Sequence, residues 1–190
     1  MLRGLVRALA LVVIAVSIVI VLDFAEILVP VKADDAAMAD TIPGCDGRVL
    51  SQGLTYRFWD PEPGHVVAVH AAETTEGELV PDRDADDRTL ILRVAAGPGD
   101  VILARQGSVF VNDLKLDDLE TAPFGPLTVP NEQYFLLGDN RSAAIDSRTF
   151  GPVLENTIFA RVFMVFWPLR DLTFRLGQGA GTSPGAIACD

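Results

Sequence analysis

The sequence is poor in residues that bind metals and nucleic acids. Its 190 residues include only two histidines, His65 and His70, and two cysteines, too few to assemble a metal site with ordinary ligand spacing. Basic residues number 15 against 26 acidic ones, which gives a net charge of −11. Phosphate binding needs clustered lysine and arginine, so we expect no nucleic-acid partner. We also expect no metal or other cofactor.

Lysine and cysteine are both scarce. Lys32 and Lys115 are the two lysines, which limits the candidates for a lysine general base. Cys45 and Cys189 could form a disulfide in an extracytoplasmic domain. We favour two unpaired thiols, because Cys189 lies in a Gly-, Ser- and Pro-rich end of the chain. The pairing stays open.

An apolar run near the N-terminus predicts a membrane anchor. Residues 8–22 carry no charge and follow Arg3 and Arg7. Spanning a bilayer takes about 20 apolar residues, and apolar neighbours extend the run. The small-x-small sequence Ala37-Met38-Ala39 lies too far downstream for cleavage as a signal peptide. We expect an uncleaved anchor with a cytoplasmic N-terminus and the bulk of the chain outside.

Composition divides the chain into three parts. Residues 1–31 hold the cytoplasmic start, the anchor and the membrane exit. Residues 32–176 predict an extracytoplasmic β domain. Residues 177–190, rich in Gly and Ala, predict a flexible tail.

Strand-like patterning dominates beyond the anchor. Apolar residues alternate with polar ones or form short runs bounded by turn residues, which is typical of antiparallel strands joined by hairpins. The acidic segment 71–88 predicts a solvated loop. The predicted strands are 66–70, 89–95, 101–104, 108–112, 133–137 and 158–167.

Two motifs resemble those of a known family. Residues 138–153 read Gly-Asp-Asn-Arg-Ser-Ala-Ala-Ile-Asp-Ser-Arg-Thr-Phe-Gly-Pro-Val, which is similar to the Gly-Asp-Asn-Arg…Asp-Ser-Arg-x-x-Gly-x-Val box of type I signal peptidases (signal peptidase I, peptidase family S26). Residues 92–100, Leu-Arg-Val-Ala-Ala-Gly-Pro-Gly-Asp, resemble that family's Lys-Arg-Val-x-Gly-x-Pro-Gly-Asp box. The resemblance implies a mainly β, antiparallel signal-peptidase-type domain with an N-terminal transmembrane helix in the plasma membrane.

The same resemblance locates the family's catalytic positions. Its nucleophile segment, Pro-x-x-Ile-Pro-Ser-x-Ser-Met-x-Pro-Thr, aligns without gaps from Pro30, which places Ala37 at the nucleophilic serine. Leu92 stands at the general-base lysine, and Ala144 at a serine that positions this lysine. Asp35 occupies an oxyanion-hole position, where losing one donor costs roughly 3–4 kcal/mol in other enzymes. The resemblance therefore implies a site without its catalytic pair.

The surrounding scaffold keeps the family's pattern. The resemblance implies that Arg93 pairs with Asp139, and Asp146 with Arg148, and buried pairs of this kind can persist for structural reasons alone. We expect Ala37 to face Leu92 across a shallow cleft floored by residues 138–148. The retained scaffold positions are Met38, Arg93, Gly138, Asp139, Asn140, Arg141, Asp146, Ser147 and Arg148.

These features favour a non-catalytic protein that binds or assists exported proteins at the outer membrane face. A peptide could lie along a strand edge without being cleaved, and pilus or secretion assembly is the nearest analogy. Phe58 and Trp59 would contact the lipid bilayer or pack in the core.

The alternative is an active type I signal peptidase that cleaves signal peptides from secreted preproteins. It would need a misaligned nucleophile or substitute chemistry, and Lys32 and Lys115 are poor substitutes for the base. An acid pair drawn from Asp34, Asp35 and Asp40 is less plausible than a solvated surface. A third possibility is a decaying copy without a role, against which the intact patterning argues.

Overall fold

The computed structural model describes residues 12–14, 17, 28–32, 36–42, 47–53, 55–85, 88–167, 169, 172, 174 and 176. Strands dominate the described part of the chain. The strands are β1 (Leu28–Lys32), β2 (Arg48–Gln52), β3 (Val66–Glu73), β4 (Leu79–Pro81), β5 (Arg88–Ala96), β6 (Val101–Arg105), β7 (Ser108–Val111), β8 (Leu114–Lys115), β9 (Phe124–Thr128), β10 (Gln133–Leu137), β11 (Val153–Leu154) and β12 (Ile158–Trp167). Short helical turns are η1 (Thr55–Arg57), α2 (Ser147–Phe150) and η2 (Glu155–Thr157).

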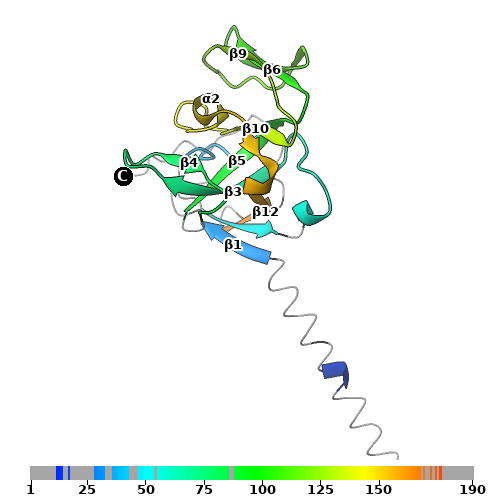
Figure 1. Ribbon diagram of the computed structural model, residues 1–190. Coiled ribbons are helices and arrows are strands. Elements are labelled where there is room, and N and C mark those ends of the chain that lie inside the picture. Colours follow the sequence, from blue (N-terminus) through cyan, green and yellow to red (C-terminus); the bar gives the residue numbers. More distant parts are fainter. Residues whose placement is uncertain are drawn as a thin grey trace, which may run out of the picture.

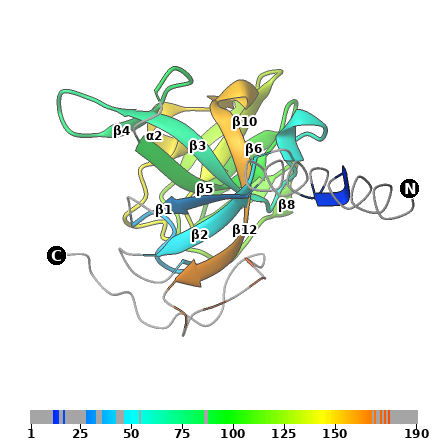
Figure 2. The same ribbon diagram turned by 90° about the horizontal axis from the view of Figure 1, so that it is seen from below.

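Two antiparallel sheets make up the domain. The larger has the order β1-β2-β12-β3-β5-β10-β11, with β4 paired to β3. The smaller has the order β8-β7-β6-β9 and stands at the end of the domain opposite β1 (Figure 1). Seen from below, β1, β2 and β12 lie side by side (Figure 2). The architecture is therefore the mainly β, antiparallel one that the sequence predicts.

The central strands are apolar on both faces because both faces are covered. In β3, Val66 and Ala68 join one buried cluster, whereas Val67 and Val69 join another. Successive side chains of a strand point to opposite faces, so a solid apolar run is what a doubly covered strand requires. A third cluster fills the junction with the small sheet.

All six predicted strands are present, but the predicted loop 71–88 is partly wrong. β3 runs on to Glu73 and pairs with β4, so that Ala71 lies opposite Pro81. Charged residues occupy this segment because β4 is a half-buried edge strand with one neighbour, so most of its surroundings are solvent.

Several predictions fall outside the described residues. These are most of the predicted anchor 8–22, Asp34, Asp35, both cysteines and the tail 177–190. Among the residues that are described, no helix has the length and apolar character needed to cross a bilayer.

Candidate functional site

The segment after β10 forms a tightly bonded loop around Asp146. This buried carboxylate caps α2, accepting from the backbone N–H of Arg148 at 3.0 Å and from its Nε at 2.8 Å. Its second oxygen accepts from the Gly138 backbone N–H at 2.9 Å. The Ser147 hydroxyl accepts from the Leu136 N–H at 2.9 Å. The loop is thus held to the end of β10, and the predicted Asp146–Arg148 pair is present.

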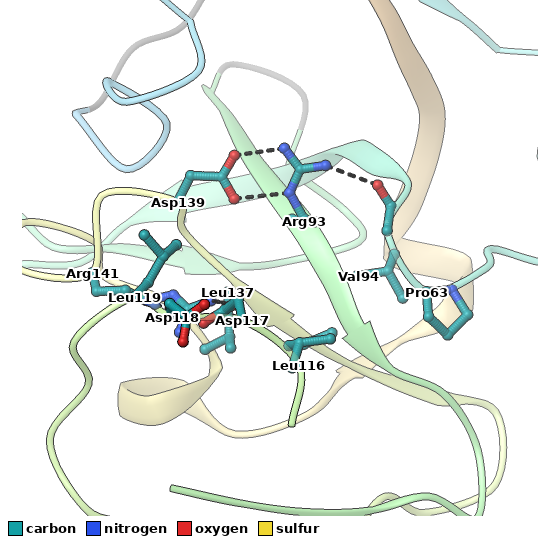
Figure 3. Close-up of a pocket in the computed structure, with 12 residues that line it drawn as sticks. Pro63, Arg93, Val94, Leu116, Asp117, Asp118, Leu119, Leu137, Asp139 and Arg141 are labelled. Carbon is teal, nitrogen blue, oxygen red and sulfur yellow. Dashed lines mark hydrogen bonds and ion pairs between the residues drawn. The ribbon is translucent and has the colours of Figure 1, made fainter. Parts of the chain in front are cut away.

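Arg93 and Asp139 form the second predicted pair. Arg93 Nε and Nη2 donate to the two Asp139 oxygens at 2.8 and 2.5 Å (Figure 3). Arg93 Nη1 donates to the carbonyls of Gly64 at 2.9 Å and Leu176 at 3.2 Å. The Thr41 hydroxyl also donates to Asp139. This ion pair and its hydrogen bonds therefore join five segments of the chain.

A turn between β1 and β2 packs onto this loop. Asn140 donates from its backbone N–H to the Ala37 carbonyl at 2.9 Å, and from Nδ2 to the Ala36 carbonyl at 3.2 Å. A Cβ added to Gly138 would lie 2.7 Å from the Ala37 carbonyl oxygen and would collide with Ala144. The turn and the loop are therefore in direct backbone contact at the position aligned with the nucleophile.

The three catalytic positions named from sequence come together. Ala37 and Leu92 belong to one buried cluster, and Ala144 packs against it. The exposed fractions are 1% for Ala37 and 0% for Leu92, so the shallow open cleft expected between them is wrong. Their side chains are small or apolar and belong to one buried cluster. Methyl and isobutyl groups offer neither a nucleophile nor a base.

The other face of β5 borders a pocket of about 360 Å³ (Figure 3). Arg141 lies beside it, donating to the Asp117 carboxylate at 2.5 Å, the Thr121 hydroxyl at 2.8 Å and the Gly138 carbonyl at 3.0 Å. The pocket lies between the large sheet and the loop that follows β8. Its lining residues are Pro63, Gly64, Arg93, Val94, Ala95, Leu116, Asp117, Asp118, Leu119, Leu137, Asp139 and Arg141.

His65 is a hydrogen-bond acceptor in the turn before β3. Its Nδ1 accepts from the Glu62 backbone N–H at 3.2 Å and lies 3.2 Å from the Tyr56 hydroxyl. Burial lowers the pKa of His65, Arg161 lowers it further, and Glu62 opposes the change. These contacts suit a neutral imidazole with a structural role.

Sequence reasoning missed three partners of the scaffold. Thr41, Asp117 and Thr121 lie 98, 24 and 20 residues from the side chains that they bond. No local pattern marks such long-range contacts, although Thr41 stands in the segment that resembles the family's nucleophile segment. In the described part of the chain, no group of three or more His, Cys, Asp or Glu side chains could hold a metal.

Comparison with known proteins agrees with the motifs. The family model described as signal peptidase, peptidase S26, matches residues 3–167. The chain is 33% identical to "Probable signal peptidase I-2" of Synechocystis over 64% of its length and 56% of the relative's. It is 30% identical to "Thylakoidal processing peptidase 1, chloroplastic" of Arabidopsis thaliana over 84% of this chain and 48% of the relative. It thus spans about half the length of these curated relatives.

Two further matches come from Gram-positive bacteria. "Signal peptidase IB" of Staphylococcus aureus is 28% identical, over 85% of this chain and 90% of the relative. A crystal structure of a signal peptidase I from Enterococcus faecalis is 22% identical, covers 54% of this chain and 97% of its own, and superposes with a TM-score of 0.42.

Proposed function

Because this chain belongs to the signal peptidase family, peptidase S26, we propose that it is a non-catalytic member that binds exported proteins at the outer face of the plasma membrane. The observation that supports this most strongly is the meeting of Ala37, Leu92 and Ala144 in one apolar cluster. The family's nucleophile, base and positioning hydroxyl all fall at this cluster, and none of these groups is present.

Peptide hydrolysis by this family's route needs a hydroxyl and a neutral amine side by side. The two lysines have other surroundings: Lys115 pairs with Asp118, and Lys32 is exposed on β1. The Ser51 hydroxyl donates to the Val29 carbonyl at 2.9 Å, and Ser147 is engaged by the β10 backbone. These contacts argue against a displaced serine and lysine pair.

A second candidate is an active peptidase that processes preproteins. The names of the relatives favour it, since each is called a signal peptidase or a processing peptidase. It would require a nucleophile and a base at positions other than Ala37 and Leu92. Its substrates would be preproteins carrying signal peptides.

In the proposed binding role, the chain lies at the same membrane and meets the same exported proteins as the family, but it does not hydrolyse peptide bonds. The apolar run 8–22 would anchor the chain, and residues 32–176 would meet exported polypeptides, including pilin-like ones. The exposed pair Phe58 and Trp59, whose ring centroids lie 5.8 Å apart, would contact lipid.

The test is capture from the native host. The full chain, carrying an affinity tag, is purified from solubilised membranes, and the N-termini of co-purified proteins are determined by mass spectrometry. A chain cut after residue 31 controls for capture by the anchor alone. The proposal predicts exported proteins enriched on the full chain, with signal sequences intact where present. Enrichment no greater than with the truncated chain would contradict binding.

A further inference from the structure

The pocket beside Arg93 is distinct from the former catalytic positions. Successive side chains of a strand point to opposite faces, so Arg93 and Ala95 face away from Leu92. Leu92 packs in the buried cluster with Ala37, whereas Arg93 and Ala95 line the pocket; Val94 belongs to that cluster and also borders the pocket. What the pocket binds is therefore a separate question from catalysis.

We propose that this pocket binds an uncharged, apolar segment of a polypeptide. Its volume of about 360 Å³ lies at the lower end of the range of small-ligand sites, roughly 300–1,000 Å³. Leu116 stands at its mouth with 38% of its surface exposed. Its apolar walls come from Pro63, Val94, Ala95, Leu116, Leu119 and Leu137.

The charges inside the pocket are already matched. Arg93 pairs with Asp139, and Arg141 pairs with Asp117, with all four side chains largely buried. Asp118 pairs with Lys115 and is exposed. A charged ligand would compete with these pairs and leave a buried charge uncompensated, whereas a neutral one leaves them intact.

The guanidinium groups here bind main-chain carbonyls. Arg93 Nη1 donates to the carbonyls of Gly64 and Leu176, and Arg141 Nε donates to that of Gly138. An arginine carries five N–H donors, and the contacts of Arg141 within the described chain use three. The pocket thus combines apolar walls with guanidinium groups that already bind main-chain carbonyls of this chain, surroundings that suit an apolar residue within a polypeptide.

This inference rests on the binding role in the proposed function. It does not require that the chain be non-catalytic. The occupant would be a short stretch of an exported protein in which leucine-like side chains alternate with accessible peptide groups.

The test uses methyl NMR on the full chain in lipid nanodiscs. The probe is acetyl-Leu-Leu-amide, compared with acetyl-Lys-Lys-amide and acetyl-Glu-Glu-amide. The proposal predicts that the leucine probe shifts the methyl signals of Leu116, Leu119 and Leu137 and binds at least several-fold more tightly than either charged probe. Leu116→Ser should weaken binding about tenfold, as loss of one apolar contact predicts.

Leu114→Ser is the matched control, because Leu114 is 75% exposed on β8, two residues away, and does not line the pocket. It should leave the affinity unchanged. Absence of shifts at the pocket, equal binding of a charged probe, or equal effects of the two substitutions would overturn the inference. Capture of exported proteins without these shifts would leave the proposed function standing and remove this pocket from it.

Discussion

At the residue scale, the positions aligned with the family's catalytic residues differ from the family pattern, whereas the ion pairs beside them match it. Ala37, Leu92 and Ala144 are small or apolar, whereas Arg93 and Asp139 keep a two-point ion pair. The surviving pairs bind neighbouring segments together, so selection for folding alone explains them. Under the proposed function, the changed residues at these three aligned positions fit a chain in which catalysis is no longer selected.

Restoring two residues should not restore the enzyme. Ala37→Ser with Leu92→Lys would place an ammonium in a fully buried site, where Ala144 offers no hydroxyl to hold it. We expect no preprotein cleavage and a loss of about 3 kcal/mol or more in the free energy of unfolding, measured by denaturant titration. Leu114→Lys, at an exposed position, controls for the added charge.

Efficient turnover by this double variant would contradict the account. The family pattern indicates that rescue also needs Ala144→Ser together with Asp34→Pro and Asp35→Ser. The five-site variant should therefore be assayed beside the double one.

His65 predicts a pH dependence of stability. Its pKa in the folded chain is lowered, chiefly by burial, from an unfolded value of 6.5. As the pH falls below 6.5, the unfolded chain binds a proton first, so stability should decline until the pH passes the lower folded pKa. Thermal unfolding between pH 8 and 5 should show this decline, and His65→Asn should flatten it. An unchanged slope in the variant would assign the decline to other groups.

At the element scale, the turn 36–42 and the loop after β10 act as one unit. Ala37, Asn140 and Gly138 join their backbones, and Thr41 reaches Asp139. These backbone and side-chain contacts hold the turn against the loop at Ala37, the position aligned with the family's nucleophile.

Gly138→Ala should separate these two elements. The new Cβ would meet the Ala37 carbonyl and the Ala144 methyl group, and we expect a cost of roughly 2–3 kcal/mol in the free energy of unfolding. Gly53→Ala is the control, because a Cβ there would meet only the Phe159 carbonyl at an ordinary 3.9 Å. Equal denaturant midpoints for the two variants would show that the turn and loop separate freely.

The Arg93–Asp139 ion pair, which joins these elements, should contribute more to the free energy of unfolding than a surface ion pair does. Asp139→Asn leaves Arg93 buried and uncompensated, which costs about 3–5 kcal/mol. Glu73→Gln breaks the half-exposed pair with Arg88 and should cost less than about 1 kcal/mol. Comparable losses in the two variants, measured by denaturant titration, would argue that the Arg93 network is dispensable.

Sequence patterning found the central strands and missed the short or irregular ones. β3, β5 and β12 have long apolar runs, but β8 and β11 have two residues each, and β9 contains Gly125 and Pro126. Most of β1 falls in residues 1–31, where the sequence predicts the anchor and membrane exit, because its proline and its closeness to the anchor hide the strand pattern. The site positions followed from sequence motifs. The burial of Ala37 could not be predicted from nearby residues, because the turn that holds it contacts loop residues 98 or more positions away in the sequence.

At the scale of the whole molecule, the chain combines a mainly β, signal-peptidase-like domain with buried residues at the positions aligned with the family's catalytic pair. The two sheets, the box motifs and the match over residues 3–167 place it in the family. The net charge of −11 argues against a nucleic-acid partner. Under the proposed function, binding without cleavage would account for both the kept scaffold and the changed residues at the aligned catalytic positions.

The central claim is tested most directly by preprotein cleavage. The purified full chain in liposomes is incubated with a preprotein carrying an Ala-x-Ala site, beside Staphylococcus aureus signal peptidase IB as a positive control. We predict mature product at the rate of protein-free liposomes. Repeated turnover that disappears in an Asp146→Ala variant purified in parallel would show that the activity belongs to this chain and would contradict the account.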